Sequence, residues 1–154
     1  MKQDRNVELN NLASNLELIL KNKNEKMIAF TSDVEDRIAD NLINDLVTIF
    51  KKNKKVLVLS YKPFLFNNKN VDSYVLNDKT DTKEDIIKKV ENYDFVLVNC
   101  PNMVKYCSYL HMKDFVKEVI IVAKQWKSRT ENIKKIKDII LENDMDFVGV
   151  VYQK

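Results

Sequence analysis

The segment IAFTSDVEDRIADNLINDL, residues 28–46, joins a short apolar run to an amphipathic run and carries acids where the two meet. Many α/β proteins bind phosphate at such a join, through a glycine-rich loop that bears a lysine. Here the join has no glycine, and its acids are Asp33, Glu35, Asp36 and Asp40. Because carboxylates repel phosphate, these residues argue against a phosphate site.

The same acids have a spacing that is typical of a helix start. Ser32 and Glu35 lie three residues apart, as in a capping box, and Asp33 and Asp36 repeat that spacing one residue later. The first amides of a helix lack partners and carry partial positive charge, so carboxylates stabilise them. We therefore predict that Ser32 or Asp33 caps the helix that follows.

The cysteines and the histidine give little support for catalysis. Cys100 and Cys107 are the only cysteines and His111 is the only histidine, a spacing that makes neither a zinc framework nor a Cys-x-x-Cys motif. Cys100 follows an expected strand, but no local base accompanies it. We expect a buried or inert thiol and a packed or surface histidine, with a Cys100-based activity as an open alternative.

Composition indicates a single globular domain over residues 1–154. The 26 basic and 23 acidic residues are interspersed, giving a net charge of +3. Locally basic runs such as KKNKK are typical of solvated helix faces, with a nucleic-acid or anionic-membrane patch as the less favoured alternative, and nucleic acid is not an expected partner. No stretch approaches the ~20 apolar residues of a membrane span, and the start of the chain lacks the apolar run of a signal peptide. We expect a cytoplasmic protein without direct membrane insertion, with a peripheral position at the membrane through a partner as an open alternative.

Short apolar runs alternate with helical periodicity along the chain. The runs predict buried strands near 27–31, 56–60, 94–99, 117–123 and 146–152, with a weaker one in residues 71–77. Helical spacing predicts helices over 5–21, from Val34 to near Asn53, over 80–92, weakly over 103–115, and over 128–144. Asn53 is a residue that tolerates a left-handed C-terminal cap, and Thr82 with Asp85 predicts a capping box.

This alternation predicts an α/β protein with three layers, in which a mostly parallel sheet is flanked by helices. Right-handed crossovers place the strand-to-helix loops at the carboxyl edge of such a sheet, which is where ligands bind. The acidic segment after the first strand falls at that edge.

The order and wording of the strands resemble one family over nearly the whole chain. The segments resemble, in the same order, those of the cytoplasmic tyrosine kinases of bacterial polysaccharide export, the BY-kinases. They are MIAFTS, KKVLVLS, YDFVLVNCP, VIIVAK and FVGVVYQ. These enzymes are relatives of the MinD and ParA ATPases, so the resemblance implies a P-loop NTPase-like fold. The match rests on framework residues rather than on functional ones.

At the family's functional positions the sequence differs almost throughout. The family's first helix carries Glu-x-x-Arg-x-x-Arg; Glu8 remains, but Asn11 and Ser14 replace the arginines. The phosphate-loop, metal-motif and base-side positions are likewise altered, and we treat them as degenerate: Asp33, Glu35, Asp36, Arg37, Ile38, Ala39 and Asp40 in the loop, Ser60, Lys62 and Asn99 in the metal motifs, and Gln153 on the base side.

The resemblance and these losses together imply a catalytically inactive regulatory or scaffold protein, without a cofactor or metal. Its expected partner is a protein, such as the cytoplasmic tail of a membrane chain-length regulator or an active kinase, and the missing arginines favour a monomer or weak dimer. Two alternatives stay open. One is a diverged ATPase or tyrosine kinase that retains some nucleotide binding; the other is an unrelated α/β module such as a receiver-like domain.

Overall fold

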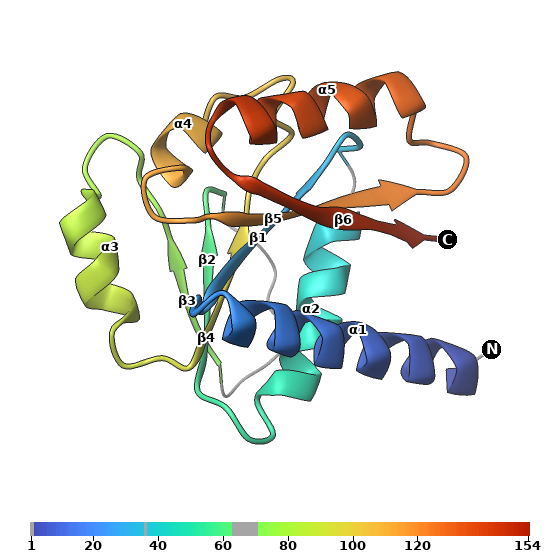
Figure 1. Cartoon of the computed structure of the whole chain (residues 1–154), viewed down its shortest axis with the longest axis horizontal. Helices are drawn as coiled ribbons and strands as arrows, with labels where there is room; N and C mark the ends of the chain where they lie inside the picture. The colour runs from blue at the N-terminus through green and yellow to red at the C-terminus, as the bar shows by residue number, and fades with distance from the viewer. Residues whose placement is uncertain (1, 36, 63–70) are drawn as a thin grey trace.

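Six parallel strands form the centre of the computed structural model, which describes residues 2–35, 37–62 and 71–154 (Figure 1). Within these residues the strand order is β3-β2-β4-β1-β5-β6. The strands are β1 (Met27–Ser32), β2 (Val56–Ser60), β3 (Asp72–Val75), β4 (Phe95–Asn99), β5 (Glu118–Lys124) and β6 (Asp146–Gln153). All adjacent pairs are parallel, so the predicted fold class is confirmed.

Helices cover both faces of this sheet (Figure 1). They are α1 (Lys2–Asn22), α2 (Ile38–Phe50), α3 (Lys83–Val90), α4 (Tyr109–Met112) and α5 (Thr130–Glu142). The buried side chains of α1 and α2 pack in one cluster with alternate residues of the strands, and those of α3, α4 and α5 pack in a second cluster with the other strand residues. The expected three layers are therefore present.

The central strands are apolar on both sides because both sides are covered. Every residue of β1 and β2 is buried, whereas the edge strand β6 is mostly half-buried. One core contact is the stacking of Phe50, at the end of α2, on Phe95 of β4, with ring centroids 4.3 Å apart. This packing fixes α2 against the sheet, and therefore also fixes the loop that leads from β1 to α2.

The strand order places one crevice at the carboxyl edge. β1 lies between β4 and β5, so the chain leaves β1 in one direction to form β2 and later returns across it to form β5. Such a topological switch point is where the loops of an α/β sheet separate and where ligands bind. The acidic segment after β1 lies at this point.

Some local predictions were correct and others were wrong. The weak strand over 71–77 exists as β3, and Thr82 with Asp85 forms the predicted capping box. The weak helix over 103–115 is only the single turn α4. Asn53 does not provide a left-handed cap: α2 ends at Phe50, its C-cap Lys51 has φ −64°, and the described non-glycine residues with positive φ are Asn24, Trp126 and Asp144. Turns that follow Phe50 close this helix without a left-handed residue.

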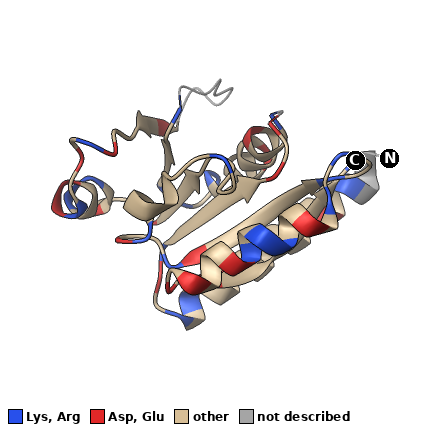
Figure 2. Cartoon of the chain, turned by 90° about the horizontal axis from the view of Figure 1, so that it is seen from above, with Lys and Arg blue, Asp and Glu red and all other residues tan. Residues whose placement is uncertain are grey.

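Charged side chains cover the outer side of α1, where basic and acidic residues are interspersed (Figure 2). Just beyond its end, the Lys23 ammonium lies 2.9 Å from the buried Glu118 carboxylate and 3.3 Å from that of Asp146. This contact ties α1 to the amino ends of β5 and β6. In the described part of the chain, no helix combines the length and the apolar character needed to cross a membrane.

Candidate functional site

A cavity of about 200 Å³ opens at the carboxyl ends of β1, β2 and β4, at the switch point of the sheet. Seven of the positions singled out in the sequence line it: Glu35, Arg37, Ala39, Asp40, Ser60, Lys62 and Asn99. Ser32, Val34, Cys100, Pro101, Asn102 and Tyr106 complete the lining. Most of the positions singled out in the sequence therefore do lie together.

Four of the predicted positions lie elsewhere or cannot be placed. Asp33 bonds to the turn before α5, and Ile38, the first residue of α2, is buried in the core. Gln153 lies at the end of β6, where its carbonyl accepts a hydrogen bond of 2.8 Å from the Gln125 amide. Asp36 falls outside the described residues.

Asp40 and Asn99 bind each other across the floor of this cavity. The Asn99 amide donates to the Asp40 carboxylate at 2.6 Å, which links the end of β4 to the first turn of α2. Both side chains are half-buried, so water can satisfy their polar atoms only in part. The hydrogen bond between them supplies a partner for each. One carboxylate and one amide thus occupy the point at which α2 begins.

A second set of contacts involves side chains that line the cavity or lie beside it. The Lys105 ammonium lies 3.0 Å from the Glu35 carboxylate, and the Lys62 ammonium lies 4.2 Å from the centre of the Tyr106 ring. The ion pair lowers the pKa of Glu35 and raises that of Lys105. These side chains come from the loop after β1, the end of β2 and the segment after β4, so three loops meet here.

The prediction that Asp33 caps the helix α2 is wrong. α2 begins five residues after Asp33, its N-cap is Arg37, and the Arg37 side chain makes no capping hydrogen bond. Asp33 instead accepts hydrogen bonds from the Ser128 hydroxyl at 2.5 Å and from the Arg129 amide at 3.0 Å. The capping-box spacing gave a wrong prediction because α2 starts later than expected. Asp33 lies in the loop before the helix, where it bonds to the turn that precedes α5.

Ser32 also has a local role that differs from capping. Its hydroxyl accepts a hydrogen bond of 3.2 Å from the Val34 amide, two residues later, which is a turn rather than a capping box. The Asn102 side chain donates to the Asp33 carbonyl at 3.3 Å. The loop after β1 is therefore held from both sides, by the segment after β4 and by the turn before α5.

The cysteine and the histidine near the cavity have structural environments. Cys100 is buried, and the burial raises the pKa of its thiol to about 12, so it stays protonated at neutral pH. His111 lies 2.7 Å from the Tyr61 hydroxyl through Nδ1 and 2.6 Å from the Asp81 carbonyl through Nε2. Since a carbonyl only accepts, Nε2 carries the proton and Nδ1 accepts from Tyr61. Neither residue is arranged for nucleophilic attack.

The described residues hold no cluster of three or more histidine, cysteine, aspartate or glutamate side chains suited to a metal ion. Sequence reasoning missed Asn102 and Tyr106, which line the cavity from the segment after Pro101, and Lys105, which pairs with Glu35 beside it. A signal was available, because loops after parallel strands gather at one edge. The link from Asp33 to Ser128 has no local signal, since the two residues are 95 positions apart.

Comparison with known proteins finds similarity in structure but not in sequence. No family model and no curated protein sequence matches the chain. The structure is similar to the BceF tyrosine kinase domain, with a TM-score of 0.77 and 12% identity over 94% of this chain and 75% of that one. It is equally similar to the kinase domain of the Escherichia coli tyrosine kinase ETK, with a TM-score of 0.77 and 14% identity over 94% of this chain and 73% of that one.

The VpsO kinase domain gives a third match, with a TM-score of 0.74 and 11% identity over 100% of this chain and 99% of that one. Identities this low establish the fold. The predicted resemblance is confirmed at that level: the chain has the fold of these tyrosine kinase domains, with a six-stranded parallel P-loop NTPase-like sheet.

Proposed function

We propose that this chain is a catalytically inactive relative of the BY-kinases that acts as a regulatory or scaffold protein in polysaccharide biosynthesis and export. The observation that carries the proposal is the hydrogen bond of 2.6 Å between Asn99 and Asp40. By the resemblance, Asn99 replaces a motif aspartate, and Asp40 falls where the phosphate loop would end. Instead of binding metal and phosphate, the two positions bind each other.

The charge of the loop disfavours nucleotide. A carboxylate about 4 Å from a phosphate charge is repelled by about 4 kcal/mol at an effective dielectric constant near 20. Asp40 and Glu35 both line the cavity, and a triphosphate would bring several charges to them. Phosphoryl transfer depends on positioning and charge neutralisation, which these residues oppose.

The backbone of the loop adds a steric argument. A phosphate loop needs glycines so that successive amides can turn toward the phosphate oxygens. The chain contains a single glycine, Gly149, which lies in β6. Two hydrogen bonds also hold the loop after β1: the Asn102 side chain donates to the Asp33 carbonyl, and the Ser128 hydroxyl donates to the Asp33 carboxylate. Opening the loop would break these bonds.

Two lysines, one in the cavity lining and one next to it, favour the alternative, a diverged ATPase or kinase that retains some nucleotide binding. Lys62 and Lys105 both carry charge that could neutralise phosphate. Lys105, however, is paired with Glu35, and Lys62 lies over the Tyr106 ring. Nucleotide would have to displace both contacts, which is why we prefer the inactive interpretation.

Titration calorimetry with ATP, ADP and GTP, with and without magnesium, tests the proposal. We expect no heat of binding for the native chain. A matched variant, Glu35→Gln with Asp40→Asn, removes both cavity carboxylates while keeping side-chain size, and we expect it also not to bind, since lysine and glycines are still missing from the loop. A micromolar dissociation constant for the native chain would overturn the proposal and support the alternative.

The proposed partner is a protein of the export system: the cytoplasmic tail of a chain-length regulator, or an active kinase. The outer side of α1 supports this idea, because it leaves Val7 and Leu18 59% and 57% exposed and also presents Glu8. Asn11 and Ser14 are exposed on the same helix where the family has arginines, so we expect a monomer or weak dimer in place of a ring.

Affinity purification from the native cell, followed by mass spectrometry, tests the partner. We expect polysaccharide-export components to be recovered, and we expect Val7→Asp with Leu18→Asp to reduce their recovery without unfolding the chain. Recovery of only unrelated soluble proteins would contradict this part of the proposal. Sedimentation velocity checks the oligomeric state, and a stable ring would contradict the expectation of a monomer or weak dimer.

A further inference from the structure

The edge strand β6 directs part of its backbone away from the sheet. Within the described residues it lies at one end of the strand order and pairs with β5 alone. The Asp146 amide donates to the Lys117 carbonyl at 2.6 Å, and the Gln153 carbonyl accepts from the Gln125 amide at 2.8 Å. Asp146 and Gln153 therefore turn their polar backbone groups toward β5, and successive residues of a strand alternate in this direction.

This alternation assigns the residues near the end of β6. Val151 turns its backbone groups toward β5, like Gln153, whereas the amides and carbonyls of Val150 and Tyr152 point away from the sheet. Earlier in the strand the register with β5 shifts at Val148, which interrupts the alternation. Among the residues that the structure describes, no hydrogen bond reaches the outward groups of Val150 or Tyr152. These groups can therefore pair with another strand.

The second half of β6 also lacks the features that commonly protect an edge strand. Proteins shorten such strands, or place lysine, proline or a bulge in them. The strand at the other edge of the sheet, β3, has only four residues. β6 has eight, DFVGVVYQ, without lysine, arginine or proline, and its charged residue, Asp146, is the first. The register shift at Val148 protects only the beginning of the strand.

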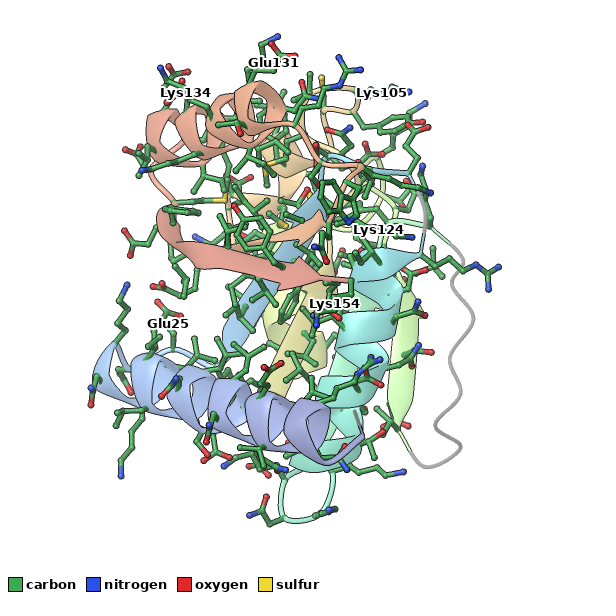
Figure 3. The ribbon with its side chains drawn as sticks, turned by 90° about the vertical axis from the view of Figure 1, so that its right-hand side faces the viewer. Glu25, Lys105, Lys124, Glu131, Lys134 and Lys154 are labelled. Atoms are coloured by element: carbon green, nitrogen blue, oxygen red, sulfur yellow. The ribbon has the colours of Figure 1, made fainter. Side chains whose placement is uncertain are left out.

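The helices next to β6 contact its faces through side chains. Figures 1 and 3 both show β6 between α5 above and α1 below. The Lys137 ammonium of α5 lies 5.0 Å from the centre of the Phe147 ring, and Val151 packs in the cluster formed by α1 and α2. Neither contact uses the outward backbone groups, and Tyr152 is 72% exposed. The outer edge of β6 is one continuous stretch of backbone between these two layers.

We propose that β6 pairs with β6 of a second copy of the chain, in an antiparallel arrangement that joins the two sheets. A two-fold axis at Val151 places Val150 of each copy opposite Tyr152 of the other, and an opposed pair of this kind exchanges two N–H···O bonds. Cross-strand pairs of an aromatic with a β-branched residue are favourable. The dimer is closed, because both copies use the same edge.

Charge complementarity favours this occupant and this direction. The antiparallel arrangement brings Asp146 of one copy toward the strand end that carries Lys154 of the other, whereas a parallel one would bring like charges together. Asp146 lies 3.3 Å from Lys23, but its side chain is still 62% exposed. Because the pairing covers only the second half of the strand, we expect a weak dimer. The proposed function allows a monomer or a weak dimer, so failure of this inference would leave that proposal standing.

Sedimentation velocity and hydrogen exchange on the full chain test the proposal. We expect the average mass to rise from that of a monomer toward that of a dimer between about 10 µM and about 1 mM protein. Over the same range, exchange at the amides of Val150 and Tyr152 should slow down, because these amides gain partners. The Val151 amide already faces β5, so its exchange should change little and serves as an internal control.

Matched variants connect the dimer to this edge. Tyr152→Lys places a charge on the outer edge at an exposed position, and it should weaken the dimer about tenfold. Val75→Lys makes a similar change at a residue of β3 that is 48% exposed, and it should leave the dimer within about twofold. Val150→Pro removes an amide that points away from β5, so it should abolish the dimer while circular dichroism stays that of the native chain.

Each of three outcomes would overturn the proposal. One is a chain that stays monomeric at about 1 mM. Another is a dimer that Tyr152→Lys leaves unchanged, which would place the interface elsewhere. The third is protection of the Val150 and Tyr152 amides only after another protein is added, which would assign the edge to a strand of that protein.

Discussion

Both α2 and α3 have an acidic residue in their first turn, but the acid of α3 bonds to a neighbouring residue and the acid of α2 bonds to a residue far along the chain. In α3 the partners are local: the Asp85 amide donates to the Thr82 hydroxyl at 3.1 Å, and the Thr82 amide donates to the Asp85 carboxylate at 3.0 Å. In α2 the carboxylate of Asp40 binds Asn99, 59 residues away. Asp33, before the same helix, binds Ser128, 95 residues away.

The surroundings of the two helices explain this difference. α3 begins on the surface, where Thr82 and Asp85 are the donors and acceptors within reach and both are exposed or half-buried. α2 begins at the centre of the sheet edge, where the end of β4 and the segment after β5 supply donors from elsewhere in the chain. A capping signal is therefore reliable where a helix start is isolated, and is easily overridden where several loops converge.

The largest expected effect comes from removing the long-range carboxylate at position 33. Asp33→Ala loses two charge-assisted hydrogen bonds and leaves the Arg129 amide without its partner, so we expect a loss of about 2 kcal/mol in the free energy of unfolding. Amide exchange should accelerate at the start of α5. Chemical denaturation and hydrogen exchange measure the two effects.

A double-mutant cycle provides the control for this prediction. Asp33→Ala and Ser128→Ala should be clearly non-additive, because the two side chains are in contact at 2.5 Å. Additive effects, or faster exchange confined to the start of α2, would mean that Asp33 acts as a cap and that the comparison is wrong.

Asn99→Asp restores the acid that the resemblance expects after β4, and it should cost somewhat less, about 1–2 kcal/mol near neutral pH. It would place two carboxylates at the distance that now separates an amide from the Asp40 carboxylate, 2.6 Å. One of them would take up a proton, so its folded pKa would lie above its unfolded value. Stability should therefore be near normal below about pH 4 and fall as pH rises.

Denaturation across this pH range measures the effect, and Asn99→Leu is the control, because it removes the hydrogen bond without adding charge. A variant Asn99→Asp whose stability loss is the same at acidic and neutral pH would contradict the prediction. It would also contradict the close contact between Asp40 and residue 99 on which the prediction rests.

The local cap of α3 should matter less. Thr82→Ala removes the hydroxyl that accepts from the Asp85 amide, and we expect a loss of about 1 kcal/mol. The hydrogen bond from the Thr82 amide is the main cause that lowers the pKa of Asp85, followed by the Thr82 hydroxyl. In the variant the pKa of Asp85 should therefore rise, but it should stay below its ordinary value.

Titration of Asp85 followed by NMR checks this prediction. A lowered folded pKa means that the contribution of Asp85 to stability is present above its unfolded pKa, about 3.9. It is lost as pH falls through the folded value. Asp85→Asn should remove this acid-dependent part, and an Asp85 pKa that returns to its ordinary value in Thr82→Ala would show that the backbone bond is not the main cause.

The strands and most helices follow from the sequence because each depends on residues within a few positions. The apolar runs at 56–60 and 94–99 predict β2 and β4 closely, since both strands are covered on each side and tolerate few polar residues. The local capping box of α3 was predicted for the same reason. The start of α2 was not, because its position depends on contacts far along the chain.

The candidate site could be predicted only in part. Glu35, Asp40, Ser60 and Asn99 were expected at the carboxyl edge, and they line one cavity. Lys105 and Tyr106 were not expected, because the weak helical pattern over 103–115 did not fix the path of the segment after Pro101, in which the helix α4 is a single turn. Which side chain binds which, as with Asp33 and Ser128, depends on loop geometry that short-range patterns do not determine.

The smallest expected effect, at Ser32, most directly distinguishes a local turn after β1 from a side-chain cap of α2. Ser32 accepts from the Val34 amide at 3.2 Å in a local turn, so Ser32→Ala should cost about 0.5 kcal/mol. Amide exchange at Asn41, which donates to the Arg37 carbonyl at the start of α2, should be unchanged. If Ser32 capped α2, the same variant would cost about 1–2 kcal/mol and expose that first turn to exchange. Hydrogen exchange followed residue by residue distinguishes these outcomes, because a cap and a turn protect different amides even where their total energies are similar.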